Sequence, residues 1–442
     1  MRIAYIAAGA AGMYCGSCIH DNTLAASLQR KGVDFALIPT YTPLRTDEPN
    51  VSIDQVFYGG INVYLQQKVG LFRHTPWFVD RLLNSKVLLN GLARLAGSTR
   101  PEDLGALTVS VLEGEVGPQK KELAKLVRWL KEDYRPDLVQ LTNSMFLGMA
   151  REIKRELQVP VLCSLQGEDI FLKGLIEPYQ SEALQLLRER ANDVDGFMAT
   201  CDDYADFMAG YLDVSRDRIH VVRLGIRLEG HGVGERDLPE VPFTIGYLAR
   251  ICPEKGLHVL ADAFHQLAGQ VGKEKLRLQV AGYLGKRDEA YFQQVRAQLD
   301  AWGLSDVFES RGEVDLEQKI DFLNRIHVLS VPTTYREPKG LFLLEAMANG
   351  VPVVQPRHGV FPEVIAATGG GILVEPNSPE ALAAGLLKMM KDTEGREAMG
   401  KQGKDVVHRV FGDERMAEAA LEVYRGYVTD SDFHSGRVSD AG

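Results

Sequence analysis

Short apolar segments alternate with longer amphipathic segments along nearly the whole chain, and this alternation limits the possible folds more than any other feature. The short segments are rich in β-branched residues and end in turn-forming residues, which is typical of buried parallel strands. The longer segments have a helical period. The sequence therefore predicts an α/β fold in which doubly wound parallel sheets carry helices on both faces.

The predicted strands fall into two groups, and 442 residues are too many for one ordinary core. The first group is residues 2–8, 33–39, 137–141, 161–165, 196–200 and 218–222, and the second is residues 243–248, 276–281, 307–309, 327–331, 352–354 and 372–374. Residues 226–241 hold three glycines and a proline and have no period, which indicates a linker. We therefore predict an N-terminal domain over residues 1–228, a linker over 229–241 and a C-terminal domain over 242–411.

Charge and cysteine content narrow the function classes. The net charge of −10 disfavours binding to long nucleic acids. Five cysteines, an odd number, fit a reducing compartment, and the absence of a leader-like start and of an 18-residue apolar run predicts a cytoplasmic protein. Cys15 and Cys18 form one CxxC pair, which fits either a metal or redox site or, more simply, small residues in a tight loop.

One stretch, residues 65–100, is basic within an acidic chain. It holds six lysines and arginines against a single aspartate, interleaved with apolar residues. Such a segment can lie on an anionic membrane surface as a peripheral contact or attract an anionic acceptor. A surface helix packed against the N-terminal domain gives the same pattern, and we favour that simpler interpretation.

A glycine-rich loop follows the first predicted strand. Gly9, Gly12 and Gly16 lead into a helix, where backbone amides can approach phosphate or sugar oxygens. Their spacing is not GxGxxG, and the acidic residue expected after the second strand of a nicotinamide-binding domain is missing. The loop therefore counts against a nicotinamide-dependent enzyme.

Two further segments carry polar residues at predicted strand ends. Arg250 and Lys255 follow the strand at 243–248 and could place two cations on one diphosphate. Glu337 lies in a loop before Gly340, which opens a helix, and Glu345 lies inside that otherwise apolar helix. A buried carboxylate needs a partner, which could be a ligand hydroxyl or neighbouring backbone amides.

These residues resemble a known family. Glu337 and Glu345 have seven residues between them, and residues 346–354 read Ala-Met-Ala-Asn-Gly-Val-Pro-Val-Val. This run is similar to that of the retaining glycosyltransferases of family 4, also called group 1. The resemblance implies the GT-B fold, in which two Rossmann-like domains face each other across a cleft, and a final helix, here about 412–428, packs back onto the N-terminal domain.

The resemblance also implies roles by position. Arg250 and Lys255 would bind the diphosphate of a nucleotide-sugar donor, Glu345 its ribose hydroxyls, and Glu337 would hold the donor sugar near the reacting carbon. Further contacts to the donor would come from Gly340, Leu341, Phe342, Gly16, Gly312 and Val314. Gln166, in the place of a family histidine, would contact the sugar, and the acceptor side would include Gly12, Glu168, Asp169 and Lys339.

Two of these positions depart from the family pattern. Gln166 can donate and accept hydrogen bonds but cannot carry a proton, which puts any acid–base role there in doubt. Lys339 stands where many members have an aromatic residue, and it could face an anionic acceptor or sugar. A solvated loop cation is the interpretation that we favour for Lys339.

The sequence as a whole predicts transfer of a sugar, with retention, from a nucleotide-diphosphate sugar to an unidentified saccharide, lipid-linked or small-molecule acceptor. Cations and a helix N-terminus can stabilise the leaving diphosphate, and no DxD-type motif lies near the donor segment, so we expect no metal cofactor. A sugar-nucleotide epimerase, a phosphorylase and a non-catalytic nucleotide-sugar-binding protein stay open as alternatives.

Overall fold

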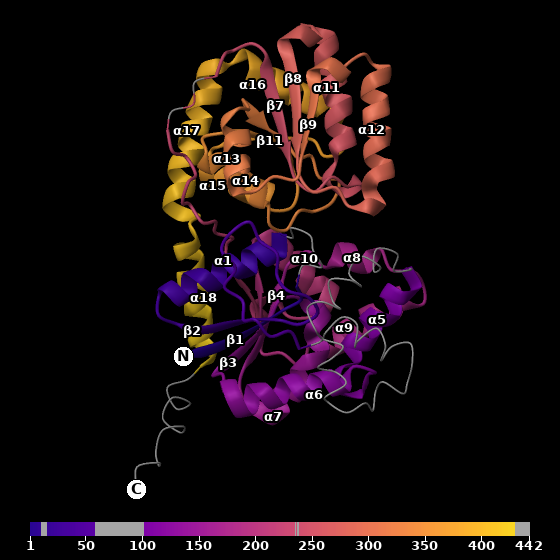
Figure 1. The fold of residues 1–442 in the computed structure, drawn as a ribbon, viewed down its shortest axis with the longest axis vertical. Coiled ribbons are helices and arrows are strands. Elements are labelled where there is room, and N and C mark those ends of the chain that lie inside the picture. The colour runs from indigo at the N-terminus through magenta and orange to yellow at the C-terminus, as the bar shows by residue number, and fades with distance from the viewer. Residues whose placement is uncertain (10–15, 58–100, 235, 237, 429–442) are drawn as a thin grey trace. The chain divides into compact units, whose positions relative to one another are not determined.

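The computed structural model describes residues 1–9, 16–57, 101–234, 236 and 238–428, and these residues form two compact units (Figure 1). Unit 1 comprises Met1–Arg223 and the residues from Met416 onward, and unit 2 comprises Leu224–Arg415. The division therefore lies ahead of the segment 229–241 that the sequence marks as a linker. Part of that segment packs onto unit 2, where the guanidinium of Arg236 donates to the Gly350 carbonyl oxygen (2.6 Å).

Unit 1 is built on a parallel sheet with the strand order β2-β1-β3-β4-β5-β6. Its strands are β1 (Arg2–Ala7), β2 (Asp34–Pro39), β3 (Leu138–Leu141), β4 (Val161–Leu165), β5 (Gly196–Ala199) and β6 (Ile219–Val221). Its helices include α1 (Gly16–Arg30), α5 (Pro101–Glu113), α6 (Lys120–Trp129), α7 (Ala150–Leu157), α8 (Asp169–Lys173), α9 (Tyr179–Arg190) and α10 (Asp202–Leu212). Every residue of β3, β4 and β5 is buried, because helices cover both faces of the sheet (Figure 1).

Unit 2 repeats this plan with the strand order β12-β11-β10-β7-β8-β9, again parallel. Its strands are β7 (Phe243–Leu248), β8 (Leu276–Ala281), β9 (Phe308–Gly312), β10 (Val328–Leu329), β11 (Val353–Pro356) and β12 (Gly371–Val374). Its helices include α11 (Leu257–Val271), α12 (Glu289–Ala301), α13 (Leu316–Asn324), α14 (Leu341–Ala348), α15 (Phe361–Thr368), α16 (Pro379–Lys391) and α17 (Thr393–Val410). The predicted α/β class is confirmed.

All the predicted strands are present, and β4, β7 and β8 have the predicted bounds. The strand predicted at 307–309 is the least accurate, because β9 runs to Gly312. It is an edge strand whose middle residues are exposed polar side chains, so its second half carries no apolar signal.

The last described helix, α18 (Asp413–Tyr427), packs on unit 1. Its Glu418 accepts from the Lys31 ammonium (2.9 Å), and the Tyr427 hydroxyl lies 2.8 Å from His220 Nε2. Just before the helix, Gly412 pairs with Ile226 in a parallel bridge. The two segments that join the units therefore run side by side within unit 2.

Candidate active site

The strand order of unit 2 reverses between β7 and β10. From β7 the chain winds outward through β8 and β9, and it then returns to the other side of β7 to form β10, β11 and β12. Because the strands are parallel, their carboxyl ends share one edge of the sheet. Doubly wound folds bind ligands at this edge, where the order reverses. The loops that follow β7 and β10 therefore make up the candidate site.

These two loops are in direct contact. The amide of Thr334 donates to the carbonyl oxygen of Glu254 (2.9 Å). Gly256 has a φ of 72°, and a Cβ atom there would lie 1.9 Å from the Pro332 carbonyl oxygen. Only glycine fits so close an approach in this conformation. The loop that carries Lys255 is thus held against the loop that leads to Glu337.

Lys255, Tyr335 and Glu337 form one hydrogen-bonded cluster. The Lys255 ammonium donates to the Tyr335 hydroxyl (2.6 Å) and to Glu337 Oε2 (2.5 Å), and the hydroxyl donates to the same Oε2 (2.6 Å). The ammonium also lies 5.1 Å from the centre of the Tyr335 ring and 5.5 Å from that of Phe342, within the range of cation–π attraction. Two aromatic rings and two oxygens therefore surround the ammonium in this structure.

Two backbone amides also donate to the Glu337 side chain. The residue is 4% exposed. Its Oε1 accepts from the amides of Lys339 and Gly340, each at 3.3 Å. Burial alone would raise the pKa of Glu337, but the Lys255 ammonium, the Tyr335 hydroxyl and the Gly340 amide outweigh burial and lower that pKa to about 2. Glu337 is therefore an ionised carboxylate throughout the neutral range.

Helix α14 begins at the same edge of the sheet. Gly340 precedes it with a φ of 63°, and a Cβ atom there would lie 2.9 Å from a methyl group of Val360. The first amides of a helix, here those of Leu341 and Phe342, have no partner inside the helix and form the positive end of its dipole. The start of α14 therefore favours an anion.

Glu345, in the middle of α14, is paired with a lysine. Its Oε1 accepts from the Lys319 ammonium at 2.6 Å, and each residue is 7% exposed. A capping box at the start of α13 places Lys319: the Asp315 side chain accepts from the Gln318 amide, and the Gln318 side chain accepts from the Asp315 amide. The sequence predicted a ligand hydroxyl or backbone amides as the partner of Glu345, and it did not predict this bond to Lys319.

The remaining donor-side residues lie around the same edge. Arg250 follows β7 with an exposed side chain, and its carbonyl oxygen accepts from the Tyr247 hydroxyl (3.0 Å). Gly312 ends β9 with a φ of 68°, and its carbonyl oxygen accepts from the Gly282 amide (2.8 Å). Val314 follows it, ahead of α13. The loops after β7, β8, β9 and β10 thus all reach this edge.

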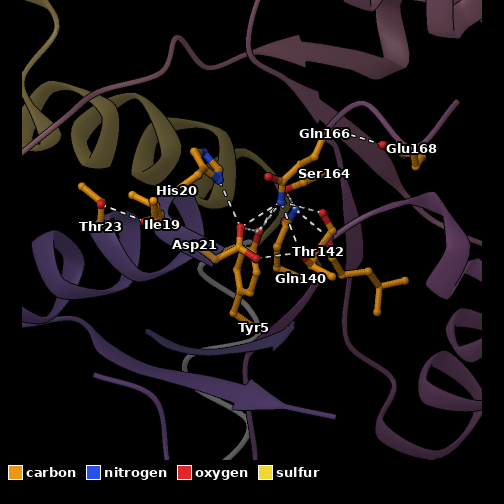
Figure 2. A network of polar contacts seen from close by, with 11 residues as sticks. Tyr5, Ile19, His20, Asp21, Thr23, Gln140, Thr142, Ser164, Gln166 and Glu168 are labelled. Carbon is orange, nitrogen blue, oxygen red and sulfur yellow. Dashed lines mark hydrogen bonds and ion pairs between the residues drawn. The ribbon is translucent and has the colours of Figure 1, made fainter. Parts of the chain in front are cut away.

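In unit 1 the strand order reverses between β1 and β3, and a network of polar side chains lies beside that point (Figure 2). Asp21 of α1 is 2% exposed. Its Oδ1 accepts from the Tyr5 hydroxyl (2.6 Å) and from Gln166 Nε2 (2.8 Å), and its Oδ2 accepts from the Thr142 hydroxyl (2.6 Å). His20 Nδ1 lies 3.1 Å from Oδ1. The carboxyl group is therefore surrounded by bonds from strands, loops and its own helix.

The acidic residues that follow β4 are bonded inside unit 1 as well. The Glu168 carboxylate accepts from the amides of Gln166 (2.7 Å) and Ser144 (3.0 Å). Asp169 accepts from the hydroxyl of Tyr204 (2.9 Å). Both acids are 6% exposed. The Glu168 carboxylate therefore holds the loops after β3 and β4 together, and the Asp169 carboxylate ties α8 to α10.

Comparison with known families decides the classification. The family described as "Glycosyl transferases group 1" matches residues 234–406, and the family described as "Glycosyl transferase 4-like domain" matches residues 22–225. Together the two matches span most of both units. The chain belongs to the group 1 glycosyltransferases.

A curated relative of this group 1 glycosyltransferase is the D-inositol 3-phosphate glycosyltransferase of Thermobifida fusca. It is 27% identical over 248 residues, which are 52% of this chain and 55% of the relative. The chain spans only 55–60% of the length of the first curated relatives that it matches.

Solved structures with the same fold cover nearly the whole chain. Sucrose-phosphate synthase from Thermosynechococcus elongatus superposes with a TM-score of 0.70 at 18% identity, over 96% of this chain and 98% of that one. Anabaena Alr3699/HepE in complex with UDP-glucose gives a TM-score of 0.66 at 15% identity, over 96% and 100%. The two sheets and these likenesses identify the two-domain GT-B fold.

Three further predicted site residues of this group 1 glycosyltransferase are Lys339, Gln166 and Gly16. Lys339 is 9% exposed, so the interpretation as a solvated loop cation is wrong. Gln166 Nε2 donates to Asp21 and to the Thr142 carbonyl oxygen (2.8 Å), so this nitrogen points into unit 1. Gly16 begins α1 and is exposed, with open space where a Cβ would lie.

Sequence reasoning did not predict Tyr335 beside Glu337, Lys319 beside Glu345, or Asp21 and Thr142 in the unit 1 network. A signal existed for two of them. Lys319 stands on the apolar face of a short helix, and Asp21 stands on a helix whose neighbours at 22, 23, 24 and 25 are buried. A charged residue on such a face requires a buried partner.

Some predicted features lie outside the described residues, namely Gly12, Cys15 and the basic segment 65–100. Cys18, the other half of the CxxC pair, is buried in α1. Within the part of the chain that the structure describes, no helix is both long enough and apolar enough to cross a membrane.

Proposed function

We propose that this protein is a retaining glycosyltransferase that moves a sugar from a nucleotide-diphosphate sugar to an acceptor hydroxyl. The observation that carries the proposal is the cluster of Lys255, Tyr335 and Glu337 where the strand order of unit 2 reverses, with Arg250 and the start of α14 at the same edge. This edge combines cations, the first amides of a helix and an ionised carboxylate. A diphosphate linked to a sugar has the complementary chemistry.

The cations act on the leaving group. When the bond between the anomeric carbon and the diphosphate oxygen breaks, negative charge develops on the diphosphate. Arg250, Lys255 and the amides of Leu341 and Phe342 are groups that stabilise such charge. The new bond forms between the anomeric carbon and the acceptor oxygen, and the proton of the acceptor hydroxyl passes to the departing diphosphate oxygen. With these groups on the diphosphate, we propose that transfer needs no metal ion.

The carboxylates act on the rest of the donor. Glu337 is ionised and is held by four hydrogen-bond donors of the protein. It would accept a hydrogen bond from a hydroxyl of the transferred sugar. Glu345 would accept a ribose hydroxyl while it keeps its bond to Lys319. Gly312, the last residue of β9, and Val314, in the loop after it, would border the base. In this scheme Gln166, Glu168 and Asp169 hold the loops of unit 1 in place. They would affect acceptor binding by setting the positions of these loops.

Solved structures with this fold suggest the first ligand to test. Alr3699/HepE has been crystallised with UDP, with UDP and glucose, and with UDP-glucose. We therefore propose a uridine nucleotide as the first donor probe. The acceptor class is left to a later screen of saccharides and lipid-linked hydroxyls.

A thermal-shift screen tests this function. The purified protein is heated with UDP, GDP or ADP and with their common sugar conjugates, each with and without EDTA. We expect one nucleotide to raise the melting temperature by several degrees, because a ligand that binds only the folded state stabilises it by mass action. The shift should persist in EDTA. No shift with any nucleotide would contradict the proposal.

A further inference from the structure

The acceptor capacity of Glu337 is fully used in the structure. A carboxylate has about four lone-pair positions. Lys255 and Tyr335 occupy those of Oε2 at 2.5 and 2.6 Å, and the amides of Lys339 and Gly340 occupy those of Oε1 at 3.3 Å. A sugar hydroxyl can therefore bond to Glu337 only if one of these donors leaves.

The two donors on Oε2 differ in their freedom to leave. Lys255 carries its ammonium on a flexible four-carbon stem and has three N–H groups, so it can turn to another anion. Tyr335 carries its hydroxyl on a rigid ring and has one O–H, which donates to Glu337. Its backbone is also fixed, because its carbonyl oxygen accepts from the Thr333 hydroxyl (3.1 Å).

We propose that Tyr335 is a positioning residue for the donor sugar. It holds Oε2 of Glu337 in place when Lys255 turns toward the donor diphosphate, and the position that Lys255 leaves on Oε2 is taken by a hydroxyl of the sugar. This inference rests on the proposed function. It extends that function by coupling recognition of the diphosphate to recognition of the sugar through one carboxylate oxygen.

A specific pattern of affinities follows. The diphosphate itself is bound by Arg250 and Lys255, so loss of the Tyr335 hydroxyl should change the affinity for UDP little. The sugar is bound by Glu337, so the same loss should weaken the additional binding that the sugar provides. The useful quantity is the ratio of the Kd for UDP to the Kd for UDP-glucose.

The variant Tyr335→Phe removes the hydroxyl and keeps the ring beneath the Lys255 ammonium. Tyr291→Phe is the matched control. The Tyr291 hydroxyl also makes two hydrogen bonds within unit 2, with the backbone amide (3.1 Å) and Nδ1 (2.9 Å) of His258, and it belongs to no part of the proposed site. Removing it reports the general effect of deleting a bonded tyrosine hydroxyl.

Isothermal titration calorimetry of the full-length protein with UDP and with UDP-glucose tests the proposal. In Tyr335→Phe we expect the ratio of the two constants to fall about tenfold, the effect of one hydrogen bond to a charged group. The Kd for UDP should change less than about threefold, and Tyr291→Phe should keep the wild-type ratio.

Other outcomes would overturn the inference. An equal weakening of UDP and UDP-glucose by Tyr335→Phe would show that the hydroxyl serves the diphosphate or the stability of the unit. An equal fall of the ratio in Tyr291→Phe would show that the effect is not specific to Glu337. If the wild-type protein bound neither compound, the proposed uridine donor would fail, and this inference with it.

Discussion

Glu337 in unit 2 and Asp21 in unit 1 are both nearly fully buried carboxyl groups beside the reversal of a parallel sheet, but they are held by different kinds of partner. Glu337 is bonded to the Lys255 ammonium and to the Tyr335 hydroxyl, and in the proposed scheme the ammonium leaves it for the diphosphate. Asp21 is bonded to the hydroxyls of Tyr5 and Thr142 and to the amide of Gln166, with His20 Nδ1 3.1 Å away. The difference teaches that burial alone does not mark a ligand site. In the proposed scheme the lysine beside Glu337 distinguishes the ligand site from the unit 1 network.

The largest effect is expected from breaking the unit 1 network. Asp21→Ala leaves the hydroxyls of Tyr5 and Thr142 and the Gln166 amide without their buried acceptor, so we expect the free energy of unfolding to fall by about 4 kcal/mol. Urea unfolding followed by circular dichroism measures this. Since the donor groups lie in unit 2, the Kd for UDP should stay within about threefold where the variant is folded. A large loss of UDP affinity would break the comparison.

Acid should weaken the unit 2 cluster in a way that Glu337 controls. The pKa of Glu337 is about 2 in the folded protein, below the ordinary value of 4.5. Its contribution to the free energy of unfolding is therefore complete above pH 4.5 and is lost as the pH falls toward 2. That difference corresponds to about 3 kcal/mol. Urea unfolding at several pH values should show a smaller acid loss for Glu337→Gln than for the wild type. Parallel curves for the two proteins would contradict the assigned pKa.

Removing the lysine beside Glu337 should affect the ligand more than the fold. Lys255→Met keeps the length of the side chain and deletes its charge, so we expect turnover of the donor to fall about 100-fold, as for the loss of one charge-stabilising donor. Donor hydrolysis or transfer measured by release of the nucleotide provides the readout. Lys125→Met is the control, because it deletes a lysine of unit 1 that pairs with the buried Glu122 (3.1 Å) and lies outside the proposed site. Equal losses in both variants would mean that Lys255 acts through stability.

The smallest effect sharpens the role of the second glutamate. Glu345→Gln keeps an oxygen that can accept from Lys319, but a neutral amide accepts a hydrogen bond from a ribose hydroxyl more weakly than a carboxylate does. The affinity for the donor should therefore fall by about tenfold. Calorimetric titration with UDP checks this, with the unfolding midpoint as the control for the fold. Unchanged affinity would rule out the ribose role.

The sequence was sufficient for the sheets but not for the side-chain partners. All the strands except the second half of β9 have a local apolar signal, so the strand pattern and the two-sheet plan could be predicted. The resemblance placed Lys255 and Glu337 in one site. The partnership of Tyr335 with Glu337 or of Lys319 with Glu345 depends on how loops and helices far apart in the chain pack, and no local period encodes it. The partners of Asp21 could not be predicted for the same reason, because Thr142 and Gln166 reach it from the loops after β3 and β4.

The most direct test of the central claim is a crystal structure of the protein with UDP-glucose bound. The account predicts that the diphosphate oxygens lie within hydrogen-bond distance of Arg250 and Lys255, and that the Lys255 ammonium lies farther from Glu337 Oε2 than the present 2.5 Å. A diphosphate bound away from this edge of unit 2, or a Lys255–Glu337 pair unchanged beneath the donor, would contradict it.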